Sequence, residues 1–287
     1  MPESERPRFA DVDVWGMTHV GKVREANQDH YFAGAVSRGV TVDRTSLGDD
    51  VAYLVEPERL ASLAIVADGV GGSADGEHAA RVAVRALVQE VARSFHEAQY
   101  EEESYPTVFT ELLHSAALNC HSSLLRRAEK ESGRGHFATT LTLFLGLWPH
   151  AYLLQVGDSR CYMFQDGKLT QITRDQTWGQ ALIDAGLLSQ TRALESRWAG
   201  VLASAIGGHE AVPVVTRITR DWGAVILLCS DGLTKHVTDE QIRGRLLAME
   251  SSRQLCEALV QDALEDGGTD NITVVVGRTR RPGEARP

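Results

Sequence analysis

Four aspartates at the ends of apolar segments are the residues of this sequence whose type and spacing suggest chemistry. Asp68 and Asp231 each follow an apolar run and precede a glycine. Asp158 lies in a short polar turn after another such run, and Asp270 comes just before one. If these runs are neighbouring strands, the four carboxylates meet at one edge and raise one another's pKa values unless a cation lies between them. Oxygen ligands favour Mg²⁺ or Mn²⁺ over zinc or copper, so the pattern indicates a site for a hard divalent ion.

Each of these aspartates also has a plainer interpretation. An Asp-Gly pair after a strand usually forms a turn, and the segment around Asp158 could be an ordinary hairpin. Arg24 and Asp29 lie in a further polar turn and could simply form a salt bridge. The guanidinium of Arg24 could instead hold a phosphate, because its fork of donors matches phosphate oxygens. Taken alone, the residues leave both interpretations open.

The elements that would position these side chains are short apolar runs and long amphipathic stretches. The runs are apolar at nearly every position, which predicts strands buried on both faces. They cover Val12–Thr18, Leu63–Ala67, Thr140–Leu147, Tyr152–Val156, Val225–Cys229 and Ile272–Val276. Helical spacing of apolar residues predicts helices over 79–95 and 108–125, and a further pair begins near Thr238 and Ser251. Strands grouped with paired helices favour an α+β fold.

Length and composition are those of one globular domain. The chain has 287 residues, of which 43% are hydrophobic and 24% are charged. We expect a single domain over residues 11–278, a disordered N-terminus at 1–10 and a disordered tail at 279–287. A polar segment at about 33–60 contains a weak strand candidate, Val51–Val55, and is interpreted as a surface insertion or a hairpin.

Charge and cysteine content argue against several classes of function. The formal net charge of −10 disfavours a nucleic-acid partner, because phosphate backbones need a basic face. No apolar stretch is long enough to cross a membrane, and the charged N-terminus does not resemble a secretory signal. The four cysteines form no CxxC pair, which disfavours a zinc site. We therefore expect a cytoplasmic protein without membrane contact.

Six short motifs resemble those of the metal-dependent type 2C (PPM) family of Ser/Thr protein phosphatases, and the match is to its bacterial type. Each motif is weak alone, but they follow one another in the family's order over about residues 12–277. The motifs are Arg24–Asp29, Val66–Gly72 with Gly76–Glu77, Ala138–Leu141, Val156–Arg160, Cys229–Leu233 and Thr269–Val274.

The resemblance implies a fold and a metal centre. The family fold is a four-layer α-β-β-α sandwich, with two antiparallel sheets flanked by helix pairs. By position, Asp68 would bridge two core Mn²⁺ or Mg²⁺ ions, and the Gly69 carbonyl would also bind metal. Asp231 and Asp270 would ligate one of the two ions. Asp29 would act through water in the outer shell.

The resemblance also implies a reaction. Asp158 would help Asp231 to form a weaker third metal site, and Arg24 would bind the substrate phosphate. Phosphothreonine or phosphoserine would be hydrolysed by a water that the two ions activate, without a phospho-enzyme intermediate. The substrates would be phosphorylated proteins, and the enzyme would oppose a bacterial Ser/Thr kinase. We expect it to be a monomer.

Some positions depart from the family pattern. Val70 stands where eukaryotic members often have a histidine, so protonation of the leaving group would fall to a water. The flap, at about 173–208, lacks several of the family's usual residues, which bears on substrate docking rather than on the metals. Its two tryptophans, Trp178 and Trp198, could be surface recognition residues, although packing in the core or the flap is the favoured interpretation.

Two other functions fit the same motifs. One is a non-catalytic regulator that binds a partner through this fold, and the four retained aspartates disfavour it. The other is a specialised phosphatase for an anti-sigma-factor antagonist, whose usual extra sensory domains are not visible in this sequence.

Overall fold

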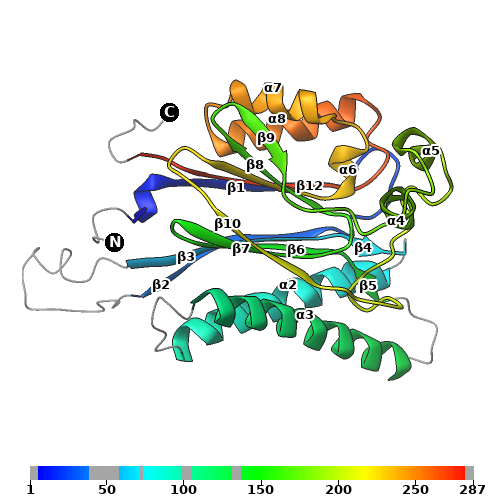
Figure 1. Ribbon diagram of the computed structural model, residues 1–287, viewed down its shortest axis with the longest axis horizontal. Coiled ribbons are helices and arrows are strands. Elements are labelled where there is room, and N and C mark those ends of the chain that lie inside the picture. The colour runs from blue at the N-terminus through cyan, green and yellow to red at the C-terminus, as the bar shows by residue number, and fades with distance from the viewer. Residues whose placement is uncertain (1–5, 39–57, 72–73, 98–104, 131–136, 282–287) are drawn as a thin grey trace, which may run out of the picture.

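Two five-stranded antiparallel sheets lie face to face between two layers of helices in the computed structural model of the chain (Figure 1). The structure describes residues 6–38, 58–71, 74–97, 105–130 and 137–281. The predicted α+β fold, a four-layer α-β-β-α sandwich, is confirmed.

Each sheet combines strands that are far apart in the sequence. The first sheet has, in spatial order, β1 (Val12–His19), β12 (Ile272–Thr279), β11 (Val225–Cys229), β8 (Arg160–Gln165) and β9 (Lys168–Gln171). The second has β10 (Val214–Thr219), β7 (His150–Val156), β6 (Leu141–Leu147), β3 (Glu58–Ala67) and β2 (His30–Arg38). A short pair, β4 (Gly69–Val70) with β5 (Ala138–Thr139), extends beyond the end of β3.

Helix pairs cover the outer face of each sheet (Figure 1). The pair on the second sheet is α2 (Ala74–Glu97) and α3 (Tyr105–Lys130), and the pair on the first is α7 (Asp239–Leu247) and α8 (Ser252–Glu265). Three short helices, α4 (Trp178–Asp184), α5 (Gln190–Leu194) and α6 (Asp231–Thr234), lie at one end of the sandwich. None of the helices within the described residues is long and apolar enough to span a membrane.

Three apolar cores fill the three interfaces between these four layers. One joins α2 and α3 to the second sheet and contains Leu87 and Leu143. Another joins α8 to the first sheet and contains Leu259, and the third lies between the sheets and contains Leu228. Strands β6 and β11 are buried at every position because they have a core on each face. This two-sided burial explains why their sequences are unbroken apolar runs.

All six predicted strands are present, whereas six further strands within the described residues are absent from the sequence prediction: β2, β4, β5, β8, β9 and β10. Strands β4 and β5 have only two residues each. Strands β2, β9 and β10 lie at sheet edges, where one side has no neighbouring strand. Their residues are mostly partly exposed, so they lack the apolar signal of the central strands. Strand β8 lies between β11 and β9, but its last residues are also partly exposed.

The expected domain boundaries differ from the structure at three places. Residues 33–38 belong to β2 and residues 58–60 to its antiparallel partner β3, while 39–57, including the strand candidate, lie outside the described residues. Residues 279 and 280 are ordered although the prediction places them in the tail, because Thr279 pairs with Val12 and buried Arg280 forms an ion pair with Asp13. At the other end, Phe9–Asp11 form a short 3₁₀ helix, η2, within and just beyond the segment predicted as disordered.

Leu87 on α2 offers a test of the helix-to-sheet core. Its side chain is fully buried, so Leu87→Ala should lower the free energy of unfolding by about 2–5 kcal/mol through lost contacts and a residual cavity. The control is Leu118→Ala on α3, where the side chain is 37% exposed and we expect a change within about 0.5 kcal/mol. Urea denaturation measures both, and equal losses would contradict this packing.

Candidate active site

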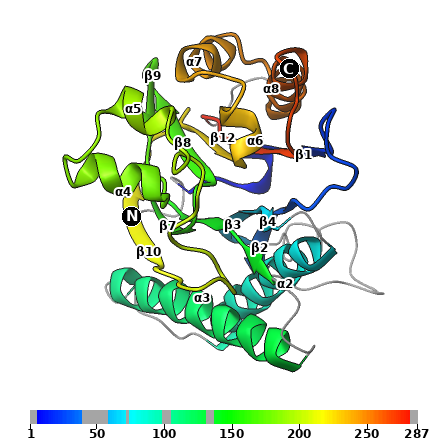
Figure 2. The ribbon, with the colours of Figure 1, turned by 90° about the vertical axis from the view of Figure 1, so that its right-hand side faces the viewer.

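Five aspartates from separate strand ends gather at one edge of the sandwich. Asp68 directly follows β3, Asp231 begins α6 just after β11, and Asp270 lies shortly before β12. Asp29 precedes β2 and Asp158 follows β7, so both join the same edge. Figure 2 looks onto this edge and shows β4 and α6 close to its centre, with α4 and α5 at the rim. The convergence predicted from the sequence is therefore present in the fold.

Two cationic side chains bind the outer carboxylates. Arg24 binds Asp270 in a bidentate manner, with its Nε 2.8 Å from Oδ1 and its Nη2 3.0 Å from Oδ2. The Nζ of Lys235 lies 2.6 Å from Oδ2 of Asp231 and 2.8 Å from Oδ2 of Asp270, so one ammonium joins two carboxylates. Lys235 is not among the residues predicted from the sequence. The available signal was its spacing of four residues from Asp231, which places both on one side of a helical turn.

Burial and mutual repulsion disfavour the charged forms of the inner carboxylates. Burial raises the pKa of Asp68 well above its ordinary value, and the charges of Asp29, Asp231, Asp158 and Asp270 raise it further. Burial, with the charge of Asp231, raises the pKa of Asp158 to about 7. The centre thus holds more negative charge than its surroundings can stabilise.

Asp270 shows the opposite balance because it has cationic partners. Burial raises its pKa, but the hydrogen bonds and charge from Lys235 and Arg24 outweigh burial, and the net pKa lies below the ordinary value. The outer carboxylates are neutralised by side chains of the chain itself, whereas the inner ones are not.

Asp29 is almost fully buried, and hydroxyl groups hold it in place. Its Oδ2 accepts hydrogen bonds from Ser230 Oγ at 2.7 Å and from Thr273 Oγ1 at 2.6 Å. Burial raises its pKa to about 6, although these two hydrogen bonds lower it. Its Oδ1 is buried and has no hydrogen-bond partner, and the same is true of Oδ1 of Asp231. These two unpaired oxygens could bind a cation directly or accept hydrogen bonds from its water shell.

The donor set fits a hard divalent cation. It consists of carboxylate and carbonyl oxygens, the ligands that Mg²⁺ and Mn²⁺ prefer. Within the described residues no three His, Cys, Asp or Glu side chains are already arranged as metal ligands. We attribute this to Lys235 and Arg24, which occupy oxygens of Asp231 and Asp270.

Close backbone packing fixes the Asp68–Gly69 turn. A Cβ on Gly69 would lie 2.4 Å from the backbone of Gly76 at the start of α2, so only glycine fits there. The carbonyl of Asp68 accepts from Thr140 N at 2.9 Å and from Thr139 Oγ1 at 2.8 Å. Asp68 N donates in turn to Thr140 Oγ1. The Ala138–Leu141 motif thus anchors the central aspartate.

Asn271 fixes the loop that carries Arg24 and Asp29. Its Nδ2 donates to the carbonyls of Val20 and Ala26, at 2.8 and 3.0 Å, and its Oδ1 accepts from Gln28 N at 2.9 Å. Because Asn271 follows Asp270 directly, a single turn before β12 positions both the outer carboxylate and the loop opposite it.

Arg160, two residues after Asp158, binds the start of the flap. The Arg160 guanidinium binds Asp175 at the start of the flap, with Nη2 2.7 Å from Oδ2 and Nε 2.9 Å from Oδ1. The flap tryptophans do not lie in a core, because Trp178 is 51% and Trp198 is 39% exposed. The Arg197 guanidinium lies 4.5 Å from the centroid of the Trp198 ring.

Comparisons with known proteins agree with this geometry. The family model described as Protein phosphatase 2C matches residues 42–267. The Serine/threonine protein phosphatase PstP of Mycobacterium tuberculosis is 35% identical over 216 residues, which are 75% of this chain and 40% of PstP. The Serine/threonine phosphatase stp of Listeria welshimeri is 30% identical, covering 75% of this chain and 83% of that protein. The chain thus spans less than half of the length of PstP.

Solved structures show the same fold. A crystal structure of the M. tuberculosis phosphatase PstP superposes with a TM-score of 0.75 at 29% identity, covering 94% of this chain and 99% of that one. A second structure, of the PstP catalytic domain with two manganese ions, has a TM-score of 0.73. From the matched family model, these relatives and the shared fold, we conclude that the chain belongs to the protein phosphatase 2C family.

Proposed function

We propose that this chain is a metal-dependent protein phosphatase that hydrolyses phosphoserine and phosphothreonine in proteins. The observation that carries the proposal is the group of five carboxylates at one edge, of which Asp29 and Asp231 each keep an unpaired buried oxygen. Such a group needs cations, and Arg24 beside it offers a guanidinium suited to phosphate. The family membership supports the same reaction.

Four groups would hold two Mn²⁺ or Mg²⁺ ions. Asp68 is the central ligand, with the Gly69 carbonyl, Asp231 and Asp270 around it. Asp29 contributes through water, because Ser230 and Thr273 already bind one of its oxygens. The PstP catalytic domain, a relative of the same fold, was crystallised with two manganese ions.

Asp158 is the residue we assign to a third, weaker metal site with Asp231. Burial is the largest cause of the raised pKa of Asp158, and the charge of Asp231 is the next largest. The effect of Asp231 indicates that the two carboxylates lie close together. When bound, the ions supply Lewis acidity and lower the pKa of water to near neutrality.

The chain's own residues bind and orient the substrate. Arg24 is exposed at the edge, so its guanidinium can leave Asp270 and bind equatorial phosphate oxygens when metal neutralises that carboxylate. The flap residues Trp178 and Trp198 have exposed rings, which we propose contact the protein part of the substrate. We further propose that the substrates are products of a Ser/Thr kinase, as the names of the relatives suggest.

The first test is a conservative change of one proposed ligand. Asp231→Asn should lower turnover of a phosphothreonine peptide with Mn²⁺ by at least about a hundredfold, because it removes one negative charge and one ligand from the metal site. The control is Asp221→Asn, in an exposed turn of the β10 to β11 connection, which should keep full activity. Near-full activity of Asp231→Asn would contradict the metal-site assignment.

Substitution of Arg24 separates phosphate binding from metal binding. Arg24→Ala should lower kcat/KM about ten- to a hundredfold through loss of charged hydrogen bonds to phosphate. Calorimetric Mn²⁺ binding without substrate should persist. The control is Arg253→Ala, an exposed residue paired with Glu257 on α8. Loss of Mn²⁺ binding in Arg24→Ala would show a structural role instead.

Lys235 should compete with metal for Asp231 and Asp270. Lys235→Met removes the ammonium that joins these carboxylates, so Mn²⁺ should bind several-fold to about tenfold more tightly. Titration calorimetry without substrate measures this, with Lys168→Met on β9 as the control. Unchanged or weaker Mn²⁺ binding in Lys235→Met would contradict direct competition.

A further inference from the structure

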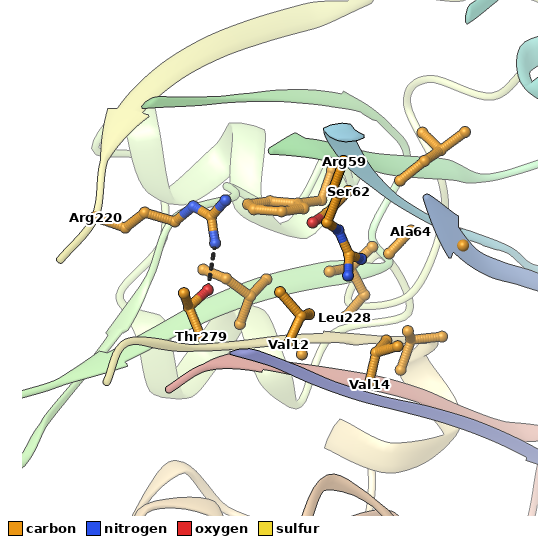
Figure 3. Close-up of a pocket in the computed structure, with 14 residues that line it drawn as sticks. Val12, Val14, Arg59, Ser62, Ala64, Arg220, Leu228 and Thr279 are labelled. Carbon is orange, nitrogen blue, oxygen red and sulfur yellow. Dashed lines mark hydrogen bonds between the residues drawn. The ribbon is translucent and has the colours of Figure 1, made fainter. Parts of the chain in front are cut away.

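A second charged centre lies between the two sheets, away from the carboxylates. It is a cavity of about 30 Å³, lined mainly by apolar residues of the facing sheets (Figure 3). Val12, Val14 and Leu228 contribute from the first sheet. Two arginines, Arg59 and Arg220, also line the cavity. A charged guanidinium beside an apolar cavity is unfavourable unless a group of opposite charge pairs with it.

Arg220 is nearly enclosed by protein, with 8% of its surface exposed. Its Nη1 donates to Thr279 Oγ1 at 2.8 Å, as the dashed line in Figure 3 marks. Its guanidinium lies over the rings of Phe144 and Trp148, 5.4 and 5.3 Å from their centroids. Its Nε is buried and donates to no acceptor among the described residues.

Arg59 faces the same space from β3. Its Nε is likewise buried and lacks an acceptor among the described residues, and its guanidinium lies 5.3 Å from the centroid of the Phe9 ring. Figure 3 shows the two guanidinium groups directed toward the space between the sheets from different sides. No described carboxylate forms an ion pair with either arginine, whereas neighbouring Arg280 is paired with Asp13.

The electrostatics of this pair are unfavourable without an anion. The pKa of Arg220 is lowered to about 10, mainly by burial and to a smaller extent by the positive charge of Arg59. Burial also lowers the pKa of Arg59. Two like charges in a poorly solvated space are costly, and the compensation proteins use is an opposite charge that accepts their hydrogen bonds. The cavity exceeds the minimum volume for one water, which is about 10–15 Å³.

We propose that this cavity is a binding site for a small oxyanion of the carboxylate or phosphate type. The free Nε groups of Arg220 and Arg59 donate to it, and the aromatic rings keep the Arg220 guanidinium in place. Arg59 is the second residue of β3 and Asp68 follows its last, so these two residues lie nine positions, about 30 Å, apart along one strand. The anion site is therefore separate from the phosphatase centre, and its existence does not depend on the proposed activity.

The test uses the full chain in EDTA, so that no metal-bound phosphate contributes. Sulfate, inorganic phosphate and acetate are titrated separately at constant ionic strength, with Tm and titration calorimetry as readouts. We expect a saturable rise in Tm with at least one of these anions. Sulfate or phosphate alone would identify a tetrahedral oxyanion, acetate alone would identify a carboxylate, and a response to both would define a general oxyanion site.

Variants locate the response. Arg220→Gln and Arg59→Gln should each weaken the apparent affinity about tenfold or more, while Arg253→Gln and Arg24→Gln should keep it. If Arg220→Gln does not fold, the less buried Arg59→Gln decides. A selenate soak of wild-type crystals should place an anomalous peak between the two arginines.

Three outcomes would overturn the proposal. One is a wild-type protein whose Tm and calorimetric signal respond to none of the anions. Another is a response that Arg24→Gln abolishes and Arg59→Gln leaves intact, which would assign it to the carboxylate edge. The third is selenate bound elsewhere with an empty cavity.

Discussion

Repulsion among like charges held at one sheet edge is the constraint on which this structure depends. Asp68 sits among four other carboxylates, and its raised pKa reflects how poorly the protein alone stabilises that charge. Only a rigid framework keeps such groups together, because a flexible one would let them separate. The buried central strands β6 and β11 supply that framework, and the aspartates are placed where the strands end.

Backbone contacts convert strand positions into a fixed carboxylate edge. Gly69 allows β4 to approach the start of α2, and Gly232 allows α6 to approach Asn271, where an added Cβ would lie 1.9 Å from a carbonyl oxygen. Hydroxyl groups of Thr140 and Ser230 then bind the aspartate backbone or carboxylate directly. In these motifs the glycines allow backbone segments to pack closely, and the hydroxyl groups bind the aspartates by hydrogen bonds. Together they fix the positions of the carboxylates.

The sequence predicts the centre of this molecule better than its edges. Asp68, Asp231 and Asp270 were identifiable because each ends a strand whose two buried faces leave an unbroken apolar signal. Edge strands such as β10 have no such signal, and their pairing depends on neighbours distant in the chain. The spacing of Lys235 from Asp231 could have indicated that ion pair, but not the second one with Asp270, which depends on the fold. Arg220 has no such spacing to its partner Thr279, which is 59 residues away in the sequence. The exposure of Trp178 likewise depends on how the flap folds.

Charge of opposite sign at the two ends of one strand follows from how the sandwich is built. Its middle is filled by apolar side chains from both sheets, which disfavours buried charges there. Near Asp68, at the C-terminal end of β3, carboxylates outnumber cations. At the N-terminal end of β3, Arg59 and Arg220 form no ion pair with a carboxylate among the described residues. An ion that binds only the folded chain stabilises it in proportion to its saturation. Ions bound at each end would therefore contribute to the stability of the fold that holds them, which ties the charge pattern to folding.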